Sequence, residues 1–156
     1  MTEKTAKKIG EAYAFAQVLR DTFLSNKDVM SEIFGEHAGN IESSTQAQQD
    51  ALEKVSETYS MTNIVLQYSE KTATKIMNMG EMYVGDDWDD AAEVLEWMSF
   101  FVGGAIVHWQ LITGSATEMN DDEFGNVAGV GTEYYAGLMD QLRSYSVLIG
   151  KQRARD

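Results

Sequence analysis

Two pairs of acidic residues have a spacing that suits a magnesium site. Glu93 and Glu96 form an ExxE pair, and Glu118 and Asp121 form an ExxD pair further along the chain. Carboxylate oxygens are ligands that hard cations such as Mg²⁺ prefer. If the fold brought the two pairs together, four carboxylates on bound Mg²⁺ would clamp a polyphosphate and activate a water molecule.

The order ExxE and then ExxD resembles the metal-binding pattern of all-α Mg²⁺-dependent nucleoside triphosphate pyrophosphatases, and this resemblance implies an alternative function. Two arguments oppose it. With 25 acidic residues in 156, such pairs are expected by chance. A helix over 86–114 would also separate Glu96 from Glu118 by on the order of 25 Å, at about 1.5 Å per residue. We therefore expect no catalytic residue, no cofactor and no metal ligand.

An acidic run follows a cluster of methionine and aromatic residues. Asp86 is a good helix N-cap, and Asp87, Asp89 and Asp90 would add negative charge to a first turn, where the helix dipole favours it. The methionines and aromatic residues exceed what a loop junction normally buries, which is typical of an apolar patch rimmed by charge. The predicted partner surface therefore comprises Met79, Met82, Tyr83, Asp86, Asp87, Trp88, Asp89 and Asp90. Packing of these side chains under the first helix is the competing interpretation.

Other common catalytic chemistry has no support in the sequence. The chain has no cysteine, which excludes disulfides, thiolate nucleophiles and zinc sites built on sulfur. His37 and His108 are the two histidines, and no second ligand accompanies either. We expect His108 to be a buried histidine with a hydrogen-bond partner. Nucleophile-elbow and phosphate-loop motifs are missing.

The charge balance is most simply explained by solubility, and its alternative interpretation is a surface that attracts a basic protein partner. Twelve basic residues against 25 acidic ones give a formal net charge of -13, which repels nucleic-acid phosphate. Direct nucleic-acid binding is therefore not expected, although an acidic mimic of nucleic acid remains an alternative. The stretch 2–20 mixes charges throughout and has no signal-peptide pattern, so we expect a cytoplasmic protein.

Apolar spacing predicts helices throughout, and the absence of proline allows them to be long. Glycines are expected to end them. The expected elements are a helix over 2–24, a short helix that begins at Ser25 or Asn26 and ends at Gly35, a long helix over 41–83 with a bend near 60–63, a helix over 86–114, and a last helix from Asn120 or Thr132 to Ile149.

The fourth of these helices is apolar on every side from Trp97 to Val107, which predicts a central position in the fold. The apolar stretch 97–112 is about 16 residues long and contains His108, whereas a membrane span needs about 20 apolar residues. We therefore expect no membrane span. In the last helix Gly125, Gly129 and Gly131 either form a loop or press closely on a neighbour, and the expected neighbour is the Gly103–Gly104 pair.

These patterns predict an all-α fold: a helical bundle of four main helices plus one short helix, in one acidic domain over 1–156. Residues 3–9 (EKTAKKI) recur as 70–76 (EKTATKI). A second echo has a different offset, close to half the chain length, and pairs Ala16, Val18 and Leu19 with Ala92, Val94 and Leu95, which leaves open two fused helical hairpins. The expected function is that of a non-enzymatic interaction protein. It would be an assembly subunit, or an acidic adaptor or inhibitor that docks on a basic protein surface, with a protein partner or self-association.

Overall fold

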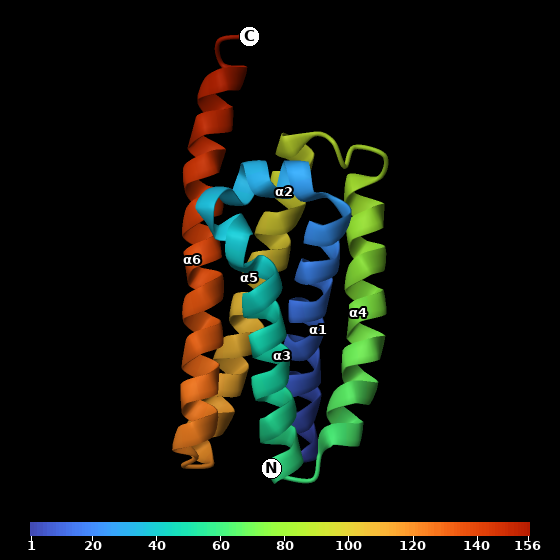
Figure 1. The fold of residues 1–156 in the computed structure, drawn as a ribbon, viewed down its shortest axis with the longest axis vertical. Helices are drawn as coiled ribbons and strands as arrows, with labels where there is room; N and C mark the ends of the chain where they lie inside the picture. Colours follow the sequence, from blue (N-terminus) through green and yellow to red (C-terminus); the bar gives the residue numbers. More distant parts are fainter.

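The computed structural model describes all 156 residues as a bundle of helices with no strand (Figure 1). This confirms the predicted all-α bundle with one short α-helix. Five long helices lie side by side, and α2 and the 3-10 helix η1 cross one end of the bundle. The elements are α1 (Glu3–Ser25), α2 (Lys27–Phe34), η1 (Gly35–Asn40), α3 (Ile41–Thr58), α4 (Thr62–Val84), α5 (Ala91–Glu118) and α6 (Asp122–Arg153).

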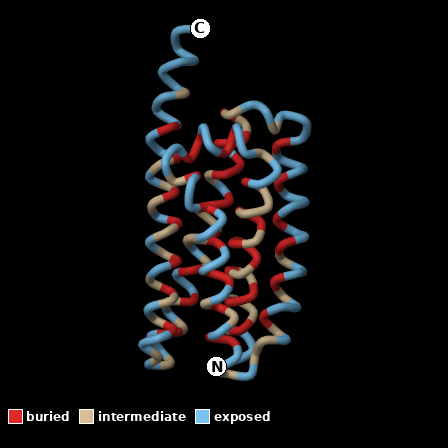
Figure 2. The backbone as a smooth tube through the Cα atoms, viewed as in Figure 1, coloured by how far each residue is buried: buried red, intermediate tan, exposed pale blue.

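α1 contacts four other helices, α2, α3, α4 and α5, whereas α6 packs mainly on α5. The buried residues of α1 lie all round the helix and include many small ones, so its neighbours approach from several sides. The core of 36 buried residues runs the length of the bundle, and Figure 2 shows buried positions on every long helix. The fully buried residues of α1 are Ala6, Ile9, Ala12, Ala14, Ala16 and Leu19.

α1 and α4 carry the repeated sequence, and they run side by side in the same direction (Figure 1). Gly10 sets their spacing: a Cβ atom there would lie 2.5 Å from the carbonyl oxygen of Val65 and 3.0 Å from Cβ of Tyr68. Real Cβ atoms do not come that close to a backbone oxygen. The two backbones therefore touch at a point where only glycine fits.

The long helix expected over 41–83 is two helices, α3 and α4, which run in opposite directions (Figure 1). The reversal lies where a bend was expected. Ser60 has φ 55°, a left-handed conformation that a continuing helix cannot contain. The chain then re-enters a helix at Thr62. Reversal allows both halves of this apolar stretch to pack against α1, which a straight rod could not do.

The start of α5 also differs from the prediction. Asp86 is not the N-cap, because Gly85 (φ 62°) ends α4 and residues 85–90 form a loop, which we call the acidic loop. The N-cap is Asp90, whose side chain accepts a hydrogen bond from the backbone N–H of Ala92 at 2.8 Å. Asp86, Asp87 and Asp89 therefore precede the helix and lie outside its first turn.

Three glycines expected to end helices, Gly80, Gly114 and Gly150, lie inside them. α5 continues past Gly114 to Glu118, and α6 continues past Gly150 to Arg153. Glycine in a helix interior costs only about 1 kcal/mol relative to alanine, so neighbouring residues outweigh it. α5 ends before Asn120, which has φ 51°. No helix of the bundle is both long enough and apolar enough to span a membrane.

The first half of α6 is helical, and one of its glycines makes the close contact that was expected. The neighbour is different: a Cβ atom at Gly131 would lie 2.3 Å from Cε3 of Trp109 on α5. Trp109 is fully buried, whereas Gly103 and Gly104 face Met139 and Phe15. A bulky indole therefore fills the space above Gly131, and the Gly103–Gly104 pair is not its partner.

We predict opposite effects for two alanine substitutions in α6. Gly131→Ala should lower the free energy of unfolding by about 1–3 kcal/mol, because its methyl group overlaps the Trp109 ring. Gly129→Ala should raise it by about 0.5–1 kcal/mol, because nothing lies within 4 Å of that position and alanine favours a helix. Urea unfolding of both variants measures this. A stabilised Gly131→Ala variant would contradict the packing of Trp109 on α6.

Candidate functional site

The two acidic pairs lie at opposite ends of α5. Glu93 and Glu96 are in its first two turns, whereas Glu118 is its last residue and Asp121 precedes α6. The helix is continuous, so Glu96 and Glu118 are about 33 Å apart at about 1.5 Å per residue. No group of three or more acidic or histidine side chains is placed to hold a metal ion. The fold does not bring the two pairs together.

Asp121 has a structural position instead. It is the N-cap of α6, and its Oδ1 accepts a hydrogen bond from the backbone N–H of Phe124 at 2.9 Å. The hydroxyl of Tyr59, at the end of α3, donates to its Oδ2. These bonds stabilise the carboxylate and hold the pKa of Asp121 below its ordinary value. Asp121 thereby ties the turn after α3 to the start of α6.

A groove opens between α4 and α5, with α1 as its floor, and we call it the α4–α5 groove. Its volume is about 300 Å³. α4 meets α5 near one end, where Gly80 packs on Trp97 and Tyr83 lies edge-on to Phe100 at 5.3 Å between ring centroids. The apolar residues that line the α4–α5 groove are Phe15, Ile76, Met79, Trp97, Phe100 and Phe101.

α5 presents a row of apolar residues to solvent beside this groove. Phe100, Gly104, Val107 and Leu111 follow one another at steps of four, three and four, the spacing of positions that contact a partner helix. We call this row the outer seam. The side chains of Phe100 and Val107 are 61% and 58% exposed. α5 contacts α1, α2, α4 and α6, in keeping with its expected central position, but no helix of this chain covers the outer seam.

The chain from Trp97 to Thr117 contains no Asp, Glu, Lys or Arg. Sequence reasoning missed the outer seam because this stretch was interpreted as core. The apolar residues all round this helix were the signal for an exposed surface. A helix in a five-helix bundle cannot bury its whole circumference, so some of these residues must face solvent.

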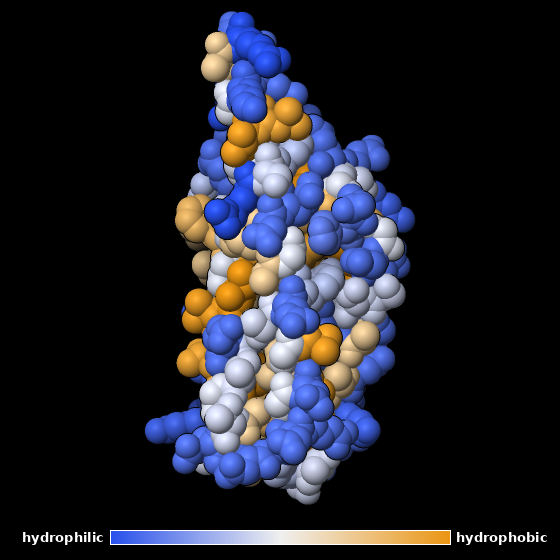
Figure 3. Space-filling model, turned by 90° about the vertical axis from the view of Figure 1, so that its left-hand side faces the viewer, coloured by the Kyte–Doolittle hydropathy of each residue, from blue (hydrophilic) through white to orange (hydrophobic).

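The exposed apolar residues of α6 do not form a comparable row. On the face that carries α6, Figure 3 shows apolar side chains in several small groups separated by hydrophilic ones. Val130, Val147 and Leu148 are the large exposed apolar residues of α6.

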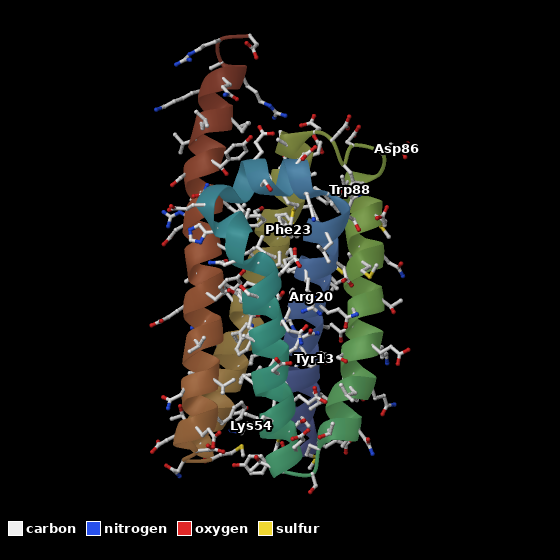
Figure 4. The ribbon with its side chains drawn as sticks, viewed as in Figure 1. Tyr13, Arg20, Phe23, Lys54, Asp86 and Trp88 are labelled. Carbon is white, nitrogen blue, oxygen red and sulfur yellow. The ribbon has the colours of Figure 1, made fainter.

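The predicted partner surface adjoins the groove and is mostly exposed. Met79 and Tyr83 lie at the groove, and Met82 is 85% exposed. The four aspartates of the acidic loop are exposed, and Figure 4 shows Asp86 at the outer edge of this loop. Trp88 is the exception: it is half-buried and packs against the core, so it anchors the loop to the bundle. That the surface binds a partner remains a prediction.

Charged side chains border both ends of the groove. Near the acidic loop, Glu96 accepts a hydrogen bond from the Tyr83 hydroxyl at 3.1 Å. Further along the groove, Glu11 lies 2.9 Å from Nε2 of His108 and 2.8 Å from Nζ of Lys8. Nδ1 of His108 donates to the carbonyl oxygen of Gly104 at 2.7 Å. His108 is therefore a half-buried histidine with two partners.

Comparison with known proteins finds no family model, no curated protein and no solved structure that matches this chain.

We predict that Asp121→Ala destabilises the fold by about 1 kcal/mol at neutral pH, the usual effect of losing an N-cap. The folded-state pKa of Asp121 is lowered, so its contribution is complete above the unfolded-state pKa of about 3.9 and is lost as the pH falls through the folded-state pKa. The difference in unfolding free energy between wild type and variant should be the same at pH 7 and 5.5 and should shrink below pH 4, as measured by urea unfolding.

The matched control is Asp122→Ala. Asp122 is exposed, follows Asp121 in the chain and lies in the first turn of α6 without being its N-cap. Its loss should cost only a few tenths of a kcal/mol. The N-cap role is contradicted if both variants lose the same free energy of unfolding. It is also contradicted if the difference in unfolding free energy between wild type and Asp121→Ala grows at low pH.

Proposed function

We propose that this chain is a non-enzymatic interaction protein that binds an amphipathic, basic helix of a partner protein along the α4–α5 groove and the outer seam. The observation that carries the proposal is the exposed, uncharged row of Phe100, Val107 and Leu111 beside a groove that six apolar side chains line together with Glu11, Lys75 and His108. We expect the complex to form in the cytoplasm.

The geometry of the groove suits a helix. Its floor is α1 and its walls are α4 and α5, so a bound helix would contact three helices at once. The residues of the outer seam are spaced by four, three and four positions. Successive turns of a partner helix can contact residues with this spacing. Gly104 lies at the groove, where a Cβ atom would come within 3.3 Å of Cζ of Phe15 on α1.

The charges of the chain favour a basic helix over a second copy. Each copy carries a formal net charge of -13, so two copies repel each other. The acidic loop and Glu96 lie beside one end of the seam and would pair with Lys or Arg at the corresponding end of the partner helix. Such pairs would steer association and would make its rate fall with increasing salt.

We predict that Val107→Asp disrupts the complex and that Val147→Asp does not. Both valines lie on long helices and are equally exposed, at 58% and 59%, so both variants should fold. A carboxylate at Val107 would be buried without a partner in the apolar interface, which should reduce the bound fraction roughly tenfold or more. Native mass spectrometry of tagged chains recovered from the organism's own cell extract measures the bound fraction at low and high salt.

Three results would count against the proposal. If a partner binds the Val107→Asp variant as well as it binds the Val147→Asp variant, its binding site is not the outer seam. Binding that does not change with salt would exclude the charge steering. A particle of twice the chain's mass that is lost in the Val107→Asp variant would identify a second copy as the occupant of the seam.

A further inference from the structure

The last turns of α6 project beyond the rest of the bundle, past the end where α2 crosses (Figure 1). Tyr145 is the last buried residue of α6, and its hydroxyl donates a hydrogen bond to the carboxylate of Glu32 on α2. Beyond Tyr145, every residue up to Arg155 is exposed except Ile149, which is half-buried. We call residues 146–155 the α6 tip.

The α6 tip has the opposite charge from the rest of the chain. Lys151, Arg153 and Arg155 lie on it without any acidic residue, whereas the whole chain has 25 acidic residues against 12 basic ones. None of the three forms an ion pair within the chain. The helix dipole favours cations in a last turn, but it does not account for the side chain of Leu148, which is 49% exposed on the same tip. A basic helix end with an exposed apolar residue suits an acidic surface that also has apolar residues.

Such a surface lies at the same end of the bundle, between the start of α2 and the acidic loop. It is a groove with a volume of about 460 Å³, which we call the end groove. Leu24 and Trp88 give it apolar surface, and Figure 4 shows Trp88 beside the start of α2. Leu24 is 44% exposed. Three acidic residues and one basic residue line it: Asp28, Glu32, Asp89 and Lys27.

The α6 tip points away from the end groove of its own chain. α6 is one continuous helix up to Arg153, and it lies on the opposite side of the bundle from Trp88 (Figures 1 and 4). A second copy can supply the missing contact. If one copy is turned by half a turn in the plane of Figure 1, about a point beyond this end, each tip comes to the end groove of the other copy. Both contacts then form at once, as in a closed two-fold dimer.

We propose that this chain forms a two-fold dimer in which the α6 tip of each copy docks in the end groove of the other. The basic residues of the tip pair with the carboxylates of the groove. Two copies repel each other as whole charges, but charges more than about 8 Å apart are largely screened at physiological ionic strength, so the opposite charges in contact decide. The dimer leaves the site of the partner helix open, because the end groove and the α4–α5 groove share no lining residue.

The first test is the mass of the purified wild-type chain, measured by sedimentation velocity at low salt and in about 1 M NaCl, where the screening length is about 3 Å. We expect a dimer at low salt and a monomer at high salt. A monomer at low salt, or a dimer that persists at high salt, would overturn the proposal. Particles larger than a dimer would also overturn it, because two-fold contacts close.

Two charge-reversed variants identify the contact. Arg153→Glu with Arg155→Glu reverses the tip, and Asp28→Lys with Asp89→Lys reverses the groove. Each variant alone should dimerise roughly tenfold more weakly or worse, because like charges then face each other at both contacts. An equal mixture of the two variants should dimerise again, because both contacts of the mixed dimer join opposite charges.

The matched control is Lys4→Glu with Lys71→Glu, which makes the same change of charge as the tip variant at exposed residues of α1 and α4. This control should stay dimeric. Val107→Asp should also stay dimeric, so loss of the dimer and loss of the partner helix can be told apart.

The proposal is wrong if the mixture of the two reversed variants stays monomeric, or if the control loses the dimer as the tip variant does. If Val107→Asp loses the dimer, the outer seam and not the α6 tip joins the copies. The salt dependence of the wild-type chain requires no substitution, so it decides the matter even if a variant fails to fold.

Discussion

The packing of other helices on α1 is the constraint on which the bundle depends. Gly10 lets the backbone of α4 touch α1, and small residues such as Ala12 and Ala16 admit neighbours on other sides. α4 and α5 are each held against α1 and meet each other near one end, at Gly80 and Trp97. The α4–α5 groove is therefore a consequence of how α1 is surrounded.

The same reasoning applies on the other side of the bundle. α5 is held to α6 through Trp109, whose ring occupies the space that a side chain at Gly131 would need. Because this large ring extends from α5 toward α6, its edge is left at the opening between α6 and α3. The contact between Trp109 and Gly131 thus holds α5 to α6 and also shapes the opening between α3 and α6. The two openings have different characters, since charged residues border the α4–α5 groove and none lines the opening between α3 and α6.

The acidic residues illustrate how position decides role. Asp90 and Asp121 both cap helices, and Asp121 also accepts a hydrogen bond from Tyr59. Glu96 has the spacing of a metal ligand but bonds to Tyr83 at the rim of the groove. Capping needs only a local backbone geometry, so it recurs throughout an acidic helical chain. A metal site needs several carboxylates to converge, and the length of α5 prevents that.

The sequence by itself determined the all-α class, the short helix that ends at Gly35, and most of the inward-facing residues, because apolar spacing and helix propensity act over a few neighbouring residues. It could not place the reversal at Ser60, choose Asp90 over Asp86 as the N-cap, or say which side of α5 stays uncovered. Those outcomes depend on contacts between residues far apart in the chain, such as Gly131 with Trp109. Whether an apolar residue becomes core or surface is fixed by how many helices fit around its own, and only the tertiary structure decides that number.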